Sequence, residues 1–141
     1  IARWTGRIKS GTVSDHISAF WDIMPTMADL LNVKIDKQID GISFLPTLIG
    51  NKNQQKQHDH LYWEFHEQGG RMALRQGDWK LVQYNIEKNP PGSIELYNLK
   101  EDPSEKNDLS QKFPDKVKEL SQIMLAERVP STAFPFAWEK R

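Results

Sequence analysis

Hydrophobic and polar residues alternate along the middle of the chain in four short runs. The runs cover residues 60–66, 71–76, 79–84 and 94–99. Because successive side chains of a strand point to opposite faces, this period of two predicts four strands. Gly-containing turns separate the first three runs, so we expect an antiparallel meander. In the first strand, Leu61, Trp63 and Phe65 share one face, which we expect to be the core face.

A longer period marks the segment that follows. Val117, Leu120 and Met124, with Ile123 beside them, form an apolar stripe at a spacing of three to four residues, and Pro114 suits a first helical turn. We expect this helix to cover one face of the sheet, because a four-stranded sheet cannot leave its apolar face in water. The Pro-broken, aromatic tail at residues 129–141 is expected to lie in a groove of this or a neighbouring domain.

The N-terminal third predicts two short helices, at about residues 23–31 and 44–49. Each has a capping residue, Asp22 or Ser43, three positions before a proline, and Asn32 and Gly50 suit the left-handed position that ends a helix. The stretch 13–21 is a weaker strand candidate with imperfect alternation. The fold class is therefore α+β, with a four-stranded antiparallel sheet packed on a C-terminal helix.

Composition narrows the function classes. The 141 residues include 19 Lys and Arg and 19 Asp and Glu, so the formal net charge is zero, which argues against a nucleic-acid or anionic-membrane partner. No hydrophobic run is long enough for a transmembrane helix. The absence of cysteine excludes disulfides, zinc–thiolate sites and a cysteine nucleophile within the chain.

The segment HDHLYWEFHEQGG, residues 58–70, concentrates candidate chemistry. If the strand ends in a four-residue turn, the expected pairs are His66 with Arg71, Glu64 with Ala73 and Tyr62 with Arg75. Three interpretations stay open: an ion-paired solvent face, a rim that contacts an anionic or glycan ligand, and a metal site at His60, Glu64 and His66. The metal site is the least favoured, because these ligands spread over more than ~10 Å along a strand and two arginines oppose a cation.

Two further patterns in the sequence bear on its chemistry. A basic and aromatic platform for a sulfated or phosphorylated sugar is one interpretation of Arg71, Arg75, Lys80, Trp63, Trp79 and Tyr84. The competing interpretation, favoured because alternation places Trp63 on the core face, has buried aromatics and solvated cations. No serine-nucleophile, phosphate-loop or zinc-protease motif occurs, and residues 101–105 lack the ligand spacing of a calcium loop.

Five ordered segments resemble the C-terminal portion of a sulfatase of the arylsulfatase type, in the alkaline-phosphatase-like superfamily. They are WTGRIKSGTVSDH, with Thr5 where the family has proline, FWDIMPTMADLLNV, DGISFLPTLIG, LYWEFHEQGGRMALRQGDWKLV and IELYNLKEDPSEKNDLSQKFPDKVKEL. The resemblance implies that residues 1–50 are the end of the catalytic domain and residues 51–141 the C-terminal subdomain. It also implies a longer parent enzyme, consistent with a chain that begins at Ile1 without Met.

The resemblance implies hydrolysis of sulfate esters, of aryl sulfates or sulfated glycans, by the parent. A formylglycine nucleophile and a calcium ion are expected in the parent's catalytic domain, so no catalytic residue or metal ligand is assigned here and the chain alone is expected to be inactive. We expect the sheet to support the fold and to wall the substrate cleft, with His66, Arg71 and Glu64 as candidate substrate-binding residues. A stand-alone module that binds anionic glycans is the alternative, and a purely structural cap is a third hypothesis.

The expected partners are the parent's catalytic domain and a sulfated small molecule or glycan. The resemblance to the family implies that the protein is located in the periplasm, in the extracellular space or, in a eukaryote, in the lysosome. Because residues 1–50 would lose their partners in the isolated chain, we expect an exposed apolar patch there and a tendency to self-associate. The residues expected in this patch are Trp4, Ile17, Trp21, Met27 and Leu31.

Overall fold

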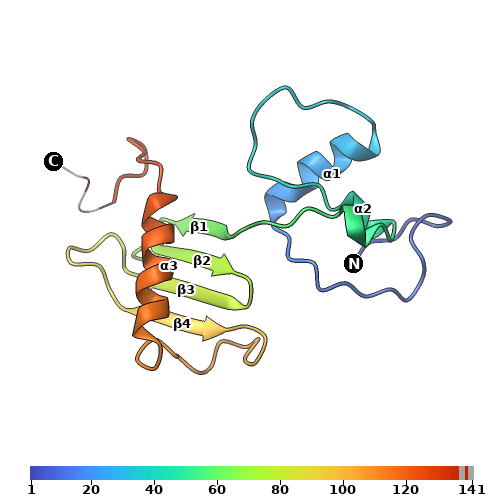
Figure 1. Ribbon diagram of the computed structural model, residues 1–141. Helices are drawn as coiled ribbons and strands as arrows, with labels where there is room; N and C mark the ends of the chain where they lie inside the picture. Colours follow the sequence, from blue (N-terminus) through green and yellow to red (C-terminus); the bar gives the residue numbers. More distant parts are fainter. Residues whose placement is uncertain (137–138, 140–141) are drawn as a thin grey trace. The chain divides into compact units, whose positions relative to one another are not determined.

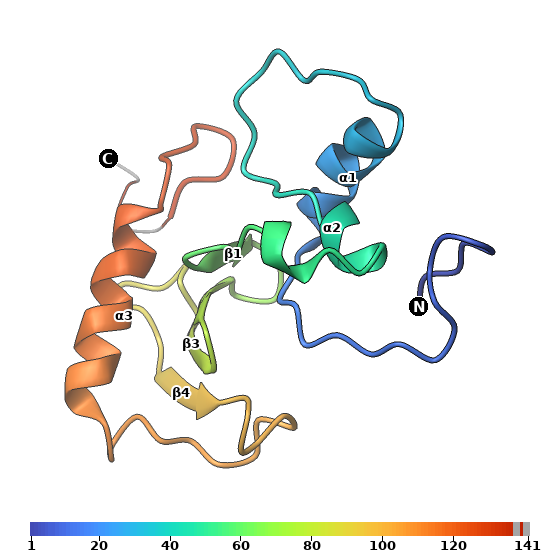
Figure 2. The ribbon, with the colours of Figure 1, turned by 45° about the vertical axis from the view of Figure 1, so that its right-hand side comes forward.

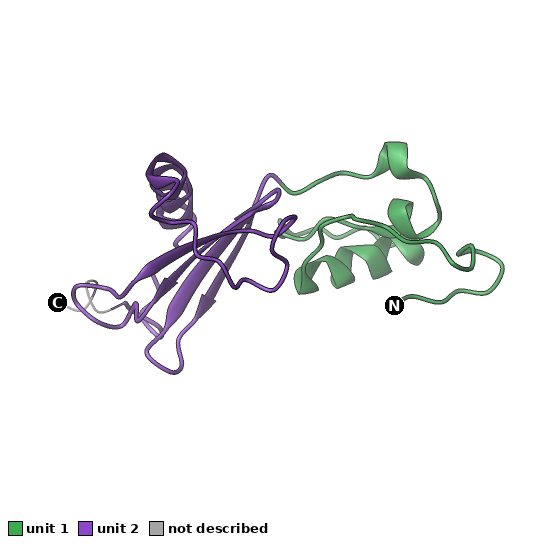
Figure 3. Ribbon diagram, turned by 90° about the horizontal axis from the view of Figure 1, so that it is seen from below, with its two compact units in different colours: residues 1–58 green, residues 59–141 purple. Residues whose placement is uncertain are grey.

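The computed structural model describes residues 1–136 and residue 139. Two compact units divide the chain, residues 1–58 and residues 59–141 (Figure 3). Each unit has its own helices or strands.

Unit 2 contains a four-stranded antiparallel sheet. Its strands are β1 (Leu61–Phe65), β2 (Arg71–Gln76), β3 (Trp79–Tyr84) and β4 (Ile94–Asn98), in the spatial order β1-β2-β3-β4. Helix α3 (Pro114–Ala126) crosses one face of this sheet (Figure 1). The predicted meander and covering helix are confirmed, and the strand bounds differ from the prediction only at the ends of β1 and β4.

The core of unit 2 lies between α3 and the sheet. It consists of Met72, Leu74, Leu81, Ile86, Leu96, Leu120, Met124 and Phe136, all fully buried. Val117 and Ile123 pack against it, which confirms the predicted stripe of α3. Phe136 belongs to the C-terminal tail, so the tail does pack into a groove of its own unit, although residues 137, 138, 140 and 141 lie outside the described residues.

Unit 1 contains α1 (Ile23–Leu30), α2 (Leu45–Leu48) and two single turns of 3₁₀ helix, Phe20–Asp22 and Lys52–Gln54. Figure 2 shows long irregular segments before and between these helices. The predicted strand at 13–21 is wrong: residues 12–19 have no regular structure and the chain then turns into the first 3₁₀ helix. Asn32 and Gly50 do adopt positive φ after the two α-helices, as expected for residues that end a helix.

Candidate functional site

The register of β1 against β2 decides which side chains share a face. The observed pairs are Leu61 with Arg75, Tyr62 with Leu74, Trp63 with Ala73, Glu64 with Met72, and Phe65 with Arg71. The predicted register is wrong by one residue, because the connection spans five residues, 66–70, and not four. A shift of one residue moves every partner to the opposite face. The structure therefore separates Glu64, which faces α3, from Arg71, which lies on the other face.

Glu64 is the centre of a polar network on the face that α3 covers. One carboxylate oxygen accepts from the Tyr62 hydroxyl, and the other lies 3.0 Å from His66 Nε2 and 3.1 Å from an Arg128 nitrogen. Burial, followed by the hydrogen bond to Glu64, raises the pKa of Tyr62 well above its ordinary value, so the phenol stays a hydrogen-bond donor. Both Glu64 oxygens are thus occupied by protein groups.

Arg128, just after α3, joins this network to the tail. Its second nitrogen lies 2.9 Å from a Glu139 carboxylate oxygen and its guanidinium carbon 4.1 Å from the centre of the Phe136 ring. The backbone N–H of Phe136, followed by Arg128, lowers the pKa of Glu139. The His66 ring lies 5.4 Å from the rings of both Phe134 and Phe136. Two predicted site residues, Glu64 and His66, therefore hold the C-terminal segment against β1.

Arg71 lies on the open face of the sheet, which no helix of unit 2 covers within the described residues. Its guanidinium carbon is 5.4 Å from the Phe65 ring and 5.9 Å from the Tyr84 ring, with one nitrogen 3.2 Å from Gln68 Oε1. Stacking between two aromatic rings holds this cation in place, and no described carboxylate pairs with it. Arg71 is therefore placed to attract an anion.

The same open face is hollowed beside Ala73. A pocket of about 350 Å³ is lined by Trp63, Ala73, Arg75, Lys80, Leu99 and Glu105. Trp63 pairs with Ala73, so the small side chain of Ala73 leaves space beside the indole. The expectation that Trp63 faces the core is wrong: its side chain is 36% exposed and lines this pocket.

Lys80 and Glu105 form one wall of this hollow. Lys80 Nζ donates to both Glu105 carboxylate oxygens, at 2.7 and 2.8 Å. Asp102 shapes the loop that carries Glu105, because its carboxylate accepts from the backbone N–H groups of Lys106 and Asn107. Those hydrogen bonds, the one from Asn107 first, lower the pKa of Asp102. The acidic stretch 101–105 thus orients Glu105 toward Lys80.

Unit 1 contains a buried polar centre that sequence reasoning missed. Asp22 is fully buried, and its carboxylate accepts from the backbone N–H of Ala19 at 2.7 Å and of Ile42 at 2.8 Å, while His58 Nε2 lies 2.8 Å away. The expected cap bond from Asp22 to the first turn of α1 is absent. Ser43, the other expected cap, does accept from the backbone N–H of Leu45, at 3.3 Å.

The neighbouring motif residues complete this centre. Thr26 Oγ1 donates to the Asp22 carbonyl at 2.6 Å and accepts from the Phe44 backbone N–H at 3.0 Å. A Cβ at Gly41 would lie 2.4 Å from the Trp21 carbonyl oxygen, so only glycine fits there. The Asp-x-x-Pro-Thr and Asp-Gly-x-Ser segments therefore fold against each other. The contact between Asp22 and His58 belongs to this packing and serves to hold unit 1 together.

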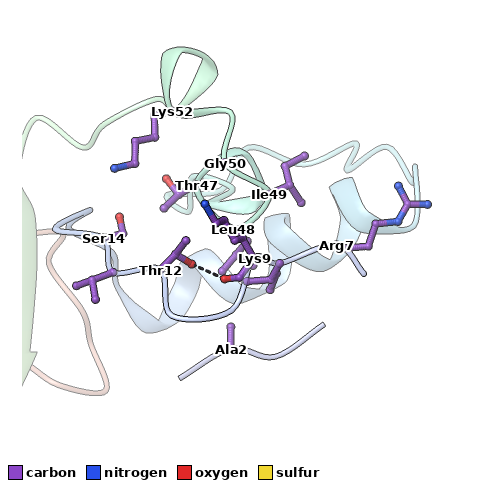
Figure 4. Close-up of a pocket in the computed structure, with 12 residues that line it drawn as sticks. Ala2, Arg7, Lys9, Thr12, Ser14, Thr47, Leu48, Ile49, Gly50 and Lys52 are labelled. Carbon is purple, nitrogen blue, oxygen red and sulfur yellow. Dashed lines mark hydrogen bonds between the residues drawn. The ribbon is translucent and has the colours of Figure 1, made fainter. Parts of the chain in front are cut away.

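A second hollow, of about 420 Å³, lies within unit 1 (Figure 4). Lys9, Thr12, Ser14, Thr47 and Lys52 contribute side chains to its lining. Arg7 also borders it, but its guanidinium stacks 5.6 Å from the centre of the Trp4 ring. This lining offers hydroxyls and exposed ammonium groups, with no carboxylate or imidazole for acid–base chemistry.

The described residues contain no group of three or more His, Asp or Glu side chains arranged to hold a metal ion. The same part of the chain has no helix long and apolar enough to cross a membrane. His60, one ligand in the least favoured metal interpretation, lies 3.1 Å from a Glu127 carboxylate oxygen. The described side chains are arranged to bind a ligand and to position segments of the chain.

Comparison with known proteins gives a consistent result. A family model described as N-sulphoglucosamine sulphohydrolase, C-terminal, matches residues 1–130. The chain is 30% identical over 133 residues to an N-acetylglucosamine-6-O-sulfatase of Bacteroides thetaiotaomicron, covering 88% of this chain and 23% of that protein. It is 31% identical over 123 residues to arylsulfatase K of Danio rerio, covering 83% of this chain and 23% of that protein.

A solved structure extends the similarity to the fold. The chain aligns with a TM-score of 0.69 and 27% identity to a protein in complex with its substrate D-glucosamine-2-N,6-O-disulfate, covering 88% of this chain and 26% of that one. The chain thus spans about a quarter of the length of the relatives that it matches.

Proposed function

The chain belongs to the N-sulphoglucosamine sulphohydrolase C-terminal family, and from this membership we propose that it forms the C-terminal part of an enzyme that hydrolyses sulfate esters. The match over residues 1–130 carries the proposal. The names of the relatives support it, because an N-acetylglucosamine-6-O-sulfatase and an arylsulfatase are among them.

The proposed substrate class is a sulfated glycan. Relatives from Bacteroides thetaiotaomicron are named for 6-O-sulfated N-acetylglucosamine, 2-O-sulfated hexuronate and 6-O-sulfated N-acetylgalactosamine. We prefer this class to simple aryl sulfates on that ground. Sulfated glycans lie outside the cytoplasm, so we place the enzyme in the periplasm, the extracellular space or the lysosome.

We place the chemistry itself in the catalytic part of the longer protein. Cleavage of a sulfate ester needs an activated nucleophile, a cation on the developing charge and a proton donor for the leaving group. A formylglycine and a calcium ion would supply the first two there. Among the described residues of this chain, no three Asp, Glu or His side chains converge as they would around a calcium ion, so we assign these residues to support of the fold and to substrate binding.

The proposed partner within the longer protein is that catalytic part. Helix α1 supports this, because its exposed side presents Ile23, Met24, Met27, Leu30 and Leu31 at the spacing of one helix face. A stripe of this kind is normally buried against another element. Pro25 and Thr26, on the opposite side of α1, are already buried within unit 1.

Substrate discrimination is proposed to involve the connection between β1 and β2, with His66 at its start and Arg71 directly after it. Arg71 would act by contact with a substrate anion. His66 and Glu64 would act by fixing the connection and the tail, because their polar atoms already bind Arg128 and each other.

One kinetic experiment tests this function. The longer gene product, this 141-residue chain and Arg71→Ala and His66→Ala variants of the longer product are assayed with a panel of 6-O- and 2-O-sulfated sugars and 4-nitrophenyl sulfate. We expect activity only in the longer product, and a change of about tenfold in the ratio of kcat/KM values among the sugars for Arg71→Ala. Lys118→Ala, on the exposed side of α3, is the matched control.

Inactivity of the longer product on every sulfate ester would overturn the proposed function. Unchanged ratios for both variants would remove the discrimination role. The gene sequence distinguishes this function from the alternative, a stand-alone module for anionic glycans. The alternative requires an open reading frame that encodes no catalytic part upstream.

A further inference from the structure

The open face of the sheet in unit 2 carries the basic and aromatic residues of the platform considered from the sequence, except Trp79, which packs against the core on the other face. Its side chains fall into three rows across the strands: Phe65, Arg71 and Tyr84; Trp63, Ala73, Val82 and Glu95; Leu61, Arg75, Lys80 and Tyr97. Aromatic and basic residues therefore gather on one surface, and the hollow beside Ala73 lies among them.

The charges on this face do not cancel locally. Lys80 is paired with Glu105, and Glu95 accepts a hydrogen bond from the Tyr97 hydroxyl. The two arginines have no carboxylate partner among the described residues. Arg71 stacks on rings, and Arg75 donates through Nε to the Gly77 carbonyl at 3.1 Å. Arginine forks with remaining donors favour sulfate or carboxylate groups.

The hollow has the composition of a saccharide subsite. Its lining includes the Trp63 indole, the Arg75 guanidinium, the Lys80–Glu105 pair and the small side chain of Ala73. Its volume of about 350 Å³ is in the range of small-ligand pockets. Aromatic rings pack against the apolar face of a sugar, and the Lys80–Glu105 pair offers both a donor and an acceptor to hydroxyl groups.

We propose that this hollow binds one residue of a sulfated glycan chain, with the sugar against Trp63, a sulfate on Arg75 and hydroxyls on Lys80 and Glu105. Arg71, in the neighbouring row with Phe65 and Tyr84, contacts a further sulfate of the glycan. The choice of a sulfated ligand rests on the proposed function as well as on the arginines. The site is separate from the Glu64–His66–Arg128 network, which lies on the face that α3 covers. Its role is to hold a polymeric substrate, not to take part in hydrolysis.

Calorimetric titration of the longer gene product with a heparin hexasaccharide tests the site. Three variants are compared with the unaltered protein: Arg75→Ala, Trp63→Ala, and Ala73→Leu, which fills the hollow and leaves every charge in place. We expect each to weaken binding by about tenfold or more, because each removes or blocks a direct contact. Arg7→Ala, an exposed arginine of unit 1, is the matched control for charge and should weaken binding less than about twofold.

Ligand chemistry is tested with N- and O-desulfated hexasaccharide, which should bind about tenfold more weakly than the sulfated one. Circular dichroism of each variant checks folding, and Ala73→Leu and Arg75→Ala keep the test informative if Trp63→Ala unfolds. Equal affinity of Ala73→Leu and the unaltered protein would overturn the proposal, as would losses for Arg75→Ala and Arg7→Ala of the same size.

Hydrolysis distinguishes this site from the proposed function. Turnover of 4-nitrophenyl sulfate should be unchanged in Ala73→Leu, while KM for a sulfated polysaccharide rises and kcat stays constant. A protein that hydrolyses sulfate esters but does not bind through the hollow retains the proposed function and loses this site. A protein that binds the hexasaccharide through the hollow without hydrolysing any ester retains this site and loses the proposed function.

Discussion

Asp108 connects β4 to the segment that leads into α3. Its Oδ1 accepts from the backbone N–H groups of Leu96 at 3.0 Å and Ser110 at 2.8 Å, and its Oδ2 accepts from the Ser110 hydroxyl at 2.8 Å. Burial raises the pKa of this carboxyl, but the three hydrogen bonds favour its charged form and outweigh burial, so its pKa lies below the ordinary value. One side chain thus fixes an edge strand and the turn before a helix.

The lowered pKa of Asp108 makes its contribution to stability depend on pH. A group whose pKa is lower in the native state stabilises that state fully above its unfolded-state pKa, and the stabilisation is lost as the pH falls through the native pKa. We expect Asp108→Asn to reduce the free energy of unfolding by about 1 kcal/mol near neutral pH, discounted for partial exposure. The difference from the unaltered protein should shrink as the pH falls below the unfolded-state pKa of an aspartate, about 3.9.

Urea unfolding at several pH values measures this difference. Asp59→Asn, at an exposed position of the same unit, is the control and should change the free energy of unfolding by less than about 0.5 kcal/mol. A deficit of Asp108→Asn that persists unchanged in acid would contradict the assignment to the charged carboxylate.

Asp22 illustrates what local sequence can predict about a residue. Its position before Pro25 and a hydrophobic run indicated a helix start, and α1 does begin at the next residue, Ile23. Its carboxylate, however, binds the backbone of Ala19 before the helix, the backbone of Ile42, twenty residues later, and the ring of His58. Spacing rules describe contacts within a turn or two, so a carboxylate that gathers distant segments was interpreted as an ordinary cap.

At the scale of elements, the hydrophobic period and the turn residues predicted which segments are strands or helices and in what order they occur, because both signals act within a few residues. The strands 71–76 and 79–84 and the stripe of α3 follow directly from them. The register of β1 did not, since Glu67–Gly70 contains enough turn residues for a connection of either four or five. That single residue reverses the faces of Trp63 and Glu64, which is why the candidate site was divided between two surfaces.

The segment after α3 acts as an element of the fold although it is irregular. Phe136 is fully buried in the core, under the Arg128 guanidinium and beside the His66 ring. We expect Phe136→Ala to lower the free energy of unfolding by about 3 to 4 kcal/mol, through lost burial and the cavity left behind. Phe134→Ala is the matched control, because Phe134 is 60% exposed, and should cost less than about 1 kcal/mol.

Denaturant unfolding of both variants, followed by circular dichroism, gives the two free energies. Equal costs for Phe134→Ala and Phe136→Ala would show that the tail does not contribute to the core as described. A change in the slope of the unfolding curve would instead indicate an altered unfolded state.

At the scale of the whole molecule, the family match and the surface of unit 1 both suggest that another part of a longer protein covers α1. The chain spans 23% of the relatives named above, and α1 exposes a stripe of apolar side chains. Of the patch expected from the sequence, Trp4, Met27 and Leu31 are exposed, whereas Ile17 and Trp21 are half-buried. The exposure of Trp4, Met27 and Leu31 could be expected only through the family resemblance, because periodicity alone assigns an apolar stripe to the core.

The isolated chain is therefore expected to self-associate through α1. Pairing of two such stripes would bury only the exposed part of each side chain, and one short helix per chain offers a small interface, so we expect weak association with a dissociation constant on the order of 100 µM. Sedimentation equilibrium of the chain across this range measures it. Met27→Glu, with a charge in the centre of the stripe, should restore a monomer, and Asp29→Asn, an exposed polar position of the same helix, should not.

Comparison with the longer gene product then identifies what the stripe normally contacts. If the catalytic part covers α1, the longer product stays monomeric at concentrations where the isolated chain associates, and Met27→Glu lowers its yield and stability. The opposite pattern, in which Met27→Glu is harmless in the longer product, would assign the stripe to an interface between copies of the enzyme. A monomeric isolated chain at the highest concentration would contradict both, because an exposed stripe of five large apolar side chains on one short helix would then be tolerated in water.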